Sequence, residues 1–86
     1  MKYQLYDHVD SLGEGTNILV DSVDEAILVA KKIIQKEIGV VEYLDPVIYT
    51  VGDITHVRIR YSVDGVPFLD PWSIQPVTTF EEFMRS

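Results

Sequence analysis

One segment of the chain carries the full set of sequence signals for an α-helix, and it limits which folds the rest can form. Ser22 and Glu25 have the spacing of a capping box, in which each side chain bonds the other residue's backbone amide. Gly39 suits the left-handed conformation that ends many helices. Between these residues, apolar side chains cover half of the helical circumference, which fits packing across a sheet. The pattern predicts a helix over residues 23–38.

Short apolar segments bounded by turn residues predict strands on both sides of this helix. We expect strands at residues 2–9, 18–21, 40–44, 47–51, 54–63 and 66–69. Asp64 and Gly65 predict a type I′ hairpin turn, since both tolerate positive φ. Pro67 lacks a backbone donor, so residues 66–69 are predicted to form an edge strand. In the tail, Thr79 and Glu82 form a second capping-box pair, which predicts one helical turn.

The register of residues 47–51 depends on the length of the turn at Gly52 and Asp53, because a slip of one residue reverses both faces of a strand. A two-residue turn puts Ile48 and Thr50 on the face of Val57. A three-residue turn puts the odd-numbered residues of the segment there, and this second arrangement is the one we expect.

Together these elements predict a single domain over residues 1–86 with an α+β fold. We expect a mainly antiparallel sheet of about five strands, with one long helix (23–38) packed on one face. A chain of 86 residues has room for one hydrophobic core and not for a second.

Composition excludes several classes of function. The chain has no cysteine, which excludes disulfides, thiolate metal sites and a cysteine nucleophile. Two histidines are too few for a multi-histidine zinc site, so we expect no metal and no cofactor. No apolar run approaches the length of a membrane span, and the first residues lack the apolar core of a signal peptide. The chain is therefore expected to be cytoplasmic.

Negative charge is concentrated at the start of the chain, which has 14 acidic and 7 basic residues and a net charge of −7 overall. The acidic residues before residue 31 are Asp7, Asp10, Glu14, Asp21, Asp24 and Glu25, against the single basic residue Lys2. One interpretation is a patch that binds a basic protein surface. The other is that these are loop residues and helix-end residues that favour the helix dipole.

Arg58 and Arg60 share one face of a predicted strand with His56. Two guanidinium groups at this spacing could hold a phosphate or a carboxylate of a partner, or they could pair with acids on neighbouring strands. His8 and His56 are the candidate general bases, but neither has a recognisable nucleophile or orienting acid. We therefore predict that the chain is not an enzyme and has no catalytic residues.

Two apolar residues have two interpretations each. Trp72 follows the last predicted strand and either anchors an interface or covers the open end of the core. Leu28 lies on the polar side of the predicted helix, where it would contact a partner or a second copy.

The segments EGTNILVDSVDEAILVAKK and YSVDGVPFLD combine a short strand, a capped helix and a hairpin in one order. Over residues 14–70 this order resembles that of small phage-encoded proteins, some of them anti-CRISPR inhibitors. The resemblance implies a non-enzymatic protein that binds and blocks a nucleoprotein complex. The negative charge of this chain implies occupation of a channel lined with lysine and arginine rather than contact with guide RNA.

Two hypotheses of function follow. The first is a small acidic protein-binding module, such as a phage-type inhibitor that occupies a basic nucleic-acid-binding surface of a host complex; direct binding of nucleic acid and of membranes is not expected. The alternative is a structural module that forms a homodimer through an edge strand or a helix face.

Overall fold

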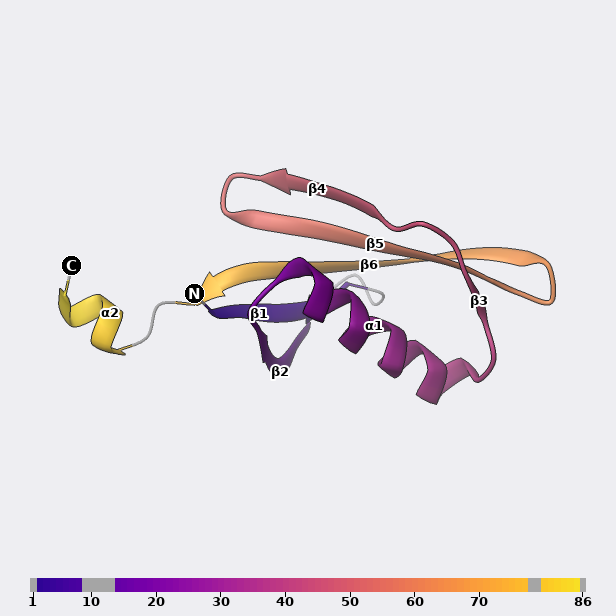
Figure 1. Cartoon of the computed structure of the whole chain (residues 1–86), viewed down its shortest axis with the longest axis horizontal. Helices are drawn as coiled ribbons and strands as arrows, with labels where there is room; N and C mark the ends of the chain where they lie inside the picture. Colours follow the sequence, from indigo (N-terminus) through magenta and orange to yellow (C-terminus); the bar gives the residue numbers. More distant parts are fainter. Residues whose placement is uncertain (1, 9–13, 78–79, 86) are drawn as a thin grey trace.

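The computed structural model describes residues 2–8, 14–77 and 80–85, and in this part of the chain six strands form one sheet. The elements in chain order are β1 (Lys2–Asp7), β2 (Glu14–Val20), α1 (Val23–Ile38), β3 (Glu42–Tyr43), β4 (Val47–Val51), β5 (Ile54–Val63), β6 (Val66–Val77) and α2 (Phe80–Arg85). The sheet order is β2-β1-β6-β5-β3, and β4 also pairs with β5 (Figure 1). All of these pairings are antiparallel.

The predicted helix over residues 23–38 is confirmed as α1, together with both of its ends. The Glu25 amide donates to Ser22 Oγ at 3.2 Å, which is one half of the predicted capping box. At the other end, the amide of Gly39 donates to the Gln35 carbonyl at 2.9 Å, and Gly39 has φ +99°. A side chain at this φ would be strained, so glycine suits this helix end.

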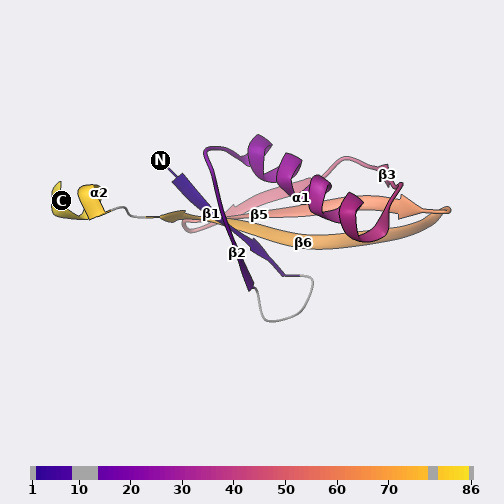
Figure 2. The same ribbon diagram turned by 90° about the horizontal axis from the view of Figure 1, so that it is seen from below.

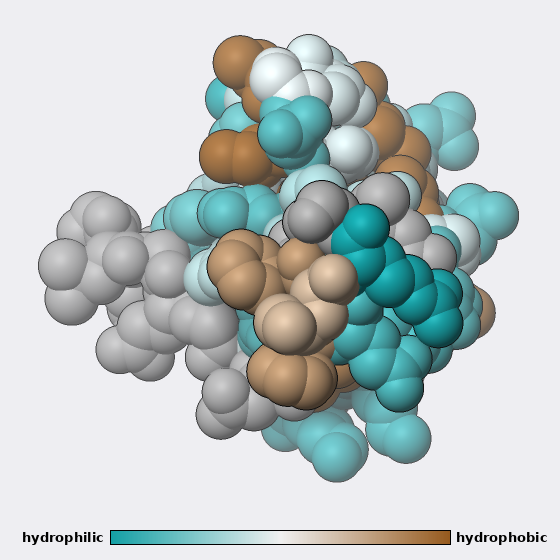
Figure 3. Space-filling view, turned by 90° about the vertical axis from the view of Figure 1, so that its left-hand side faces the viewer, coloured by the Kyte–Doolittle hydropathy of each residue, from teal (hydrophilic) through white to brown (hydrophobic). Residues whose placement is uncertain are grey.

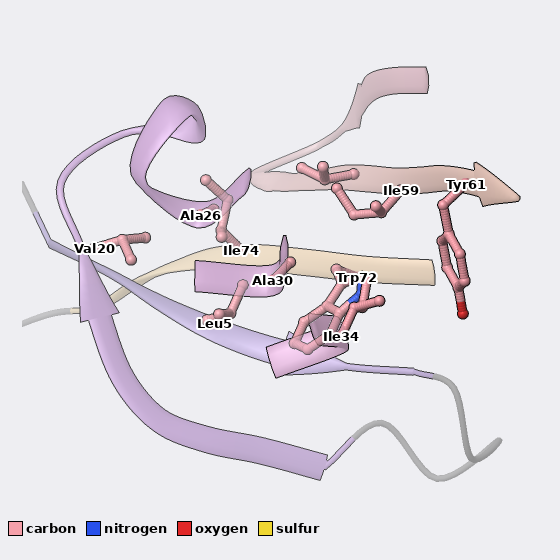
Figure 4. Close-up of a cluster of buried hydrophobic side chains, with 10 residues drawn as sticks. Leu5, Val20, Ala26, Ala30, Ile34, Ile59, Tyr61, Trp72 and Ile74 are labelled. Atoms are coloured by element: carbon pink, nitrogen blue, oxygen red, sulfur yellow. The ribbon is translucent and has the colours of Figure 1, made fainter. Parts of the chain in front are cut away.

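The hydrophobic core lies between α1 and one face of the sheet (Figure 4). The helix contributes Ala26, Ala30 and Ile34, which recur every four residues along one side of α1. The strands contribute Leu5, Val20, Val57, Ile59, Tyr61, Trp72 and Ile74. The two alanines let the helix backbone approach the sheet closely, while the larger side chains of the strands fill the remaining space.

The predicted fold class is wrong in its architecture. The chain is mostly sheet, the sheet curls into a half-barrel, and a second short helix follows β6, so one long helix on a flat sheet does not describe it (Figure 2). The ten residues of β5 and the twelve of β6 form the long hairpin of this sheet. Strands of this length accumulate the right-handed twist of the polypeptide, which favours a curled sheet over a flat one.

The expected edge strand over residues 66–69 is the first part of β6, which lies in the middle of the sheet despite its three prolines. Residues of an antiparallel strand direct their N–H groups to opposite neighbours in turn. Val66 pairs with Val63 across the hairpin turn, so its N–H points to β5, as do those of the other even-numbered residues of β6. The missing donors of Pro67 and Pro71 are therefore on the side of β1, and that of Pro76 is on the side of β5.

Pro67 and Pro76 face no paired strand in the described part of the chain, whereas Pro71 lies opposite His8, whose amide donates to the Pro71 carbonyl at 2.9 Å. β1 pairs only with residues 72–77 of β6, and β5 pairs only with residues 66–74. Two of the prolines therefore fall where no ladder hydrogen bond is lost, and at Pro71 only the bond reciprocal to that of the His8 amide is absent. Residues 66–70 do form a local edge on the side of β1, so the edge prediction holds for one side of this segment only.

The predicted turn of helix in the tail is α2, although Thr79 of the second capping box lies outside the described residues. α2 buries none of its residues, and it lies at one end of the long axis of the molecule (Figure 1). Viewed from that end, hydrophobic and hydrophilic residues lie on separate sides of the surface nearest the viewer (Figure 3).

Candidate interaction surface

The face of the sheet turned away from α1, here called the open face, carries four residues aligned across four strands. Tyr6 of β1 pairs with Ser73 of β6. Ser73 pairs on its other side with His56 of β5, which pairs with Tyr49 of β4. His8 and Arg58 lie on the same face, two residues after Tyr6 and His56 respectively. We call the whole set the open-face cluster, which consists of Tyr6, His8, Tyr49, His56, Arg58 and Ser73.

Ser73 holds one histidine of the open-face cluster in place. His8 Nε2 lies 2.6 Å from Ser73 Oγ, and the His8 amide donates to the Pro71 carbonyl at 2.9 Å. The rings of His8 and Tyr6 stack with their centroids 6.4 Å apart. Ser73 has no exposed surface, so its hydroxyl orients His8 and is out of reach of a substrate.

The other histidine of the open-face cluster belongs to a stack at the edge of the sheet. The rings of His56 and Tyr49 stack at 4.8 Å between centroids. Arg58 Nη2 donates to the Tyr49 hydroxyl at 3.1 Å, and Arg58 Cζ lies 5.3 Å from the Tyr49 ring centroid. Arg58 therefore reaches from β5 across to β4, and its guanidinium lies over the outer strand.

The interpretation that both arginines pair with acids on neighbouring strands is wrong for the residues that the structure describes. Arg58 bonds a tyrosine hydroxyl, and Arg60 Nη1 donates to the backbone carbonyl of Asp45 at 3.4 Å. An ion pair in the described segments joins Lys2 Nζ to Asp21 Oδ1 at 2.7 Å. The two hydrogen bonds of the arginines thus use one nitrogen of each guanidinium group, and binding of a partner there stays a prediction.

β4 is an exposed strand without charged residues. All five of its side chains, VIYTV, are exposed, and Val51 is the most exposed of its large apolar residues at 61%. Ile48 pairs with Val57 and Tyr49 with His56, so the expected register is wrong and the alternative with a two-residue turn is observed. Gly52 has φ +61° at the first central position, as in a type II′ turn, and no third loop residue is needed.

The register also shows which backbone groups of β4 point outward. Val51 and Ile54 flank the two-residue turn and form a hydrogen-bonded pair, as do residues 49 and 56 two steps further on. The amides of Ile48 and Thr50 lie between these positions and point away from β5. Among the described residues, no strand pairs with this outer side of β4.

The two exposed edges in this half of the sheet differ in how well they resist pairing. Pro67 faces the free side of β6, where it removes a donor that another strand would need, and Pro71 ends this free side opposite His8. β4 has no proline and no charge between Val47 and Val51, and its residues are β-branched or aromatic. Such a strand is a template for the addition of another strand.

The structure separates the six predicted acidic residues. Asp7 pairs with Trp72 in the strand register, and its charge adds to the effect of burial, which is the main cause of the raised pKa of Asp70. Asp21 is paired with Lys2, while Asp24 and Glu25 lie in the exposed first turn of α1. Asp10 and the side chain of Glu14 lie outside the described residues. Asp21 thus serves an ion pair, and Asp24 and Glu25 serve a helix end.

The other two predicted interface residues have different positions. Trp72 is 2% exposed, so it belongs to the core and does not anchor an interface. Leu28 is 67% exposed on the outer side of α1, as the sequence predicts. Sequence reasoning missed Ser73 and Tyr49, although alternation along each strand places them on the same face as the two histidines.

The described residues include a surface hollow beside β4 but no grouped set of metal-ligating side chains. Among them, no three histidine, aspartate or glutamate side chains are grouped to hold a metal ion. A shallow hollow of about 540 Å³ lies where β6 passes the end of β5, lined by Val51, Gly52, Asp53, Ile54, Gln75 and Pro76. It adjoins the end of β4 and extends the surface beside it.

No protein-family model, curated protein or solved structure matches this chain. In the part of the chain that the structure describes, neither helix has the length and apolar content needed to cross a bilayer.

Proposed function

We propose that this protein is a non-enzymatic protein-binding module that adds an extended segment of its partner to the free edge of β4. The observation that carries this proposal is the uncharged strand Val47–Val51, in which every side chain is exposed and whose outward amides face no other strand in the described residues. Backbone hydrogen bonds would supply affinity, and side chains on the two faces would supply selectivity.

The open-face cluster supports a binding role rather than a catalytic one. The hydroxyl beside His8 is fully buried, and His56 stacks on a tyrosine instead of contacting a nucleophile. Tyrosine and arginine are enriched at the centres of protein interfaces, and both stand beside β4 here.

The phage-type inhibitor hypothesis is compatible with this mode of binding and stays a prediction, as does a cytoplasmic location. Asp24 and Glu25 are exposed on α1 and would remain available to a basic surface elsewhere on the partner whose extended segment β4 holds. A homodimer through β4 is a second way to cover the same edge. The predicted edge at residues 66–69 is less suited to pairing, because Pro67 removes a donor on its free side and Pro71 follows two residues after its end.

A proline at position 50 tests the proposal, because it removes an amide that points to the partner and not to β5. We expect Thr50→Pro to fold, since edge strands accept proline where the N–H faces outward. We expect it to reduce binding of the partner at least about tenfold, as one backbone hydrogen bond and the fit of the strand are lost. Recovery of proteins from a host extract by the tagged chain, quantified by mass spectrometry, measures this.

The matched control is Thr50→Val, which keeps the amide but removes the Thr50 hydroxyl that lies 3.2 Å from Thr55 Oγ1. A partner bound by the wild type and by Thr50→Val, and lost with Thr50→Pro, would support the proposal. If folded Thr50→Pro recovered the same proteins in the same amounts, strand addition at β4 would be excluded.

A further inference from the structure

Arg58 gives the edge at β4 a chemical preference that its uncharged strand lacks. Its guanidinium leaves β5 and lies over Tyr49, with Nη2 3.1 Å from the hydroxyl oxygen. Because the tyrosine oxygen accepts from Arg58, the tyrosine proton remains available to an acceptor further out. An incoming strand would lie about 4.8 Å beyond β4, within reach of both donors.

The position next to Tyr49 brings side chains close together. Tyr49 directs its backbone groups to β5, so a residue opposite it on an added strand would form a non-hydrogen-bonded pair, in which side chains approach most closely. On the open face, such a side chain would meet the Tyr49 hydroxyl and the Arg58 guanidinium. A carboxylate accepts hydrogen bonds from both groups and is attracted by the positive charge of the second.

Resting on the proposed function, we infer that the segment received by β4 presents a carboxylate, from aspartate or glutamate, opposite Tyr49. The partner is thus an acidic extended segment of another protein. A second copy fits less well, because β4 itself contains no carboxylate to place opposite Tyr49, and two copies pairing there would bring their Arg58 side chains together.

Arg60 provides an internal comparison for this inference. It has the same charge and lies on the same face, but its guanidinium rests on the Asp45 carbonyl, and Glu42 stands opposite the neighbouring residue Ser62. Arg60 thus has a backbone acceptor beside β3, with one acidic residue of the chain, Glu42, in a neighbouring position of the register. Of the two arginines, only Arg58 lies over a part of the edge, Val47–Val51, that has no acid.

Two short peptides of alternating valine and threonine, identical except for a central glutamate or glutamine, test the inference. Their affinities are measured by fluorescence anisotropy on the wild type, Arg58→Gln, Arg60→Gln and Thr50→Pro. We expect the glutamate peptide to bind the wild type about five-fold more tightly, as for a partly exposed charge-assisted contact. The net charge of −7 repels the glutamate peptide, so tighter binding of this peptide would have to come from contacts near Arg58 and not from the overall charge.

The variants separate the possible outcomes. If the inference is correct, the ratio of the two affinities falls to about one in Arg58→Gln and keeps its wild-type value in Arg60→Gln. Equal binding of the two peptides to the wild type, or equal loss of the preference in both arginine variants, would overturn the inference while leaving strand addition intact. Failure of both peptides to bind, or binding unaffected by Thr50→Pro, would instead overturn the proposed function and the inference with it.

Discussion

Replacing Trp72 with alanine will lower the free energy of unfolding by about 3–5 kcal/mol, which is most of the stability of a domain of this size. Trp72 is the largest fully buried side chain of the described residues and is 2% exposed. It belongs to β6, the middle strand of the sheet, and lies on the face that α1 covers (Figure 4). Its removal would leave a cavity where the half-barrel and the helix meet. Urea unfolding followed by circular dichroism measures the change.

Phenylalanine at position 72 is the informative control. Trp72 Nε1 is buried and has no hydrogen-bond partner among the described residues, which is a cost that phenylalanine does not carry. We therefore expect Trp72→Phe to lose less than half of the stability that Trp72→Ala loses. A small effect of Trp72→Ala, below about 1 kcal/mol, would contradict a core position and favour an exposed interface role.

Alkaline pH will destabilise the fold through Tyr61. Burial, and then its hydrogen bond to Asp70 Oδ1 at 3.0 Å, raise the pKa of Tyr61 from 10.0 to about 12. In the unfolded chain the phenol loses its proton near pH 10, while the folded chain keeps it until about pH 12. The unfolded state thus binds fewer protons in this range, and stability falls by about 2–3 kcal/mol as pH rises through it.

Tyr61→Phe isolates this contribution, because phenylalanine keeps the ring that stacks on Phe68 at 5.6 Å between centroids. We expect the variant to have a shallower loss of stability between pH 10 and 12, and we expect one fewer late-titrating phenol in its ultraviolet absorbance. Tyr43, whose pKa burial also raises, accounts for part of the remaining slope. Identical slopes for the variant and the wild type would show that Tyr61 titrates normally.

The ends of α1 and the β5–β6 turn could be predicted from the sequence, because each depends on a few residues that are close together in the chain. Ser22 and Gly39 mark the ends of α1, and both bond backbone groups of the helix as expected. Asp64 and Gly65 have φ +52° and +81°, the two positive values of the predicted type I′ turn. In each case a few neighbouring residues favour the structure regardless of the rest of the chain.

Long-range features of the fold are not predictable in this way. The effect of Pro67, Pro71 and Pro76 depends on where β1 and β5 end, and only the assembled sheet shows that Pro67 and Pro76 face no paired strand while Pro71 lies opposite His8. The curl of the sheet depends on the summed twist of paired strands. The side chains of β4 are exposed on both faces, so hydrophobic burial gave no basis for choosing its register.

The candidate surface was predictable only in part. Alternation along the strands places His8, His56 and Arg58 away from the core, as observed. Their neighbours on that face come from other strands, so the contacts of Ser73 with His8 and of Tyr49 with Arg58 required the sheet order. The acidic residues form a cluster in the sequence, but the described ones belong to different parts of the fold.

Amide hydrogen exchange along β4 tests most directly whether this strand is an open edge that receives another strand. In the free protein, we expect the amides of Ile48 and Thr50 to exchange at least about tenfold faster than those of Tyr49 and Val51, which bond to β5. With the glutamate peptide bound, all four should exchange slowly. Slow exchange of Ile48 and Thr50 in the free monomer, or fast exchange in the complex, would contradict strand addition at β4.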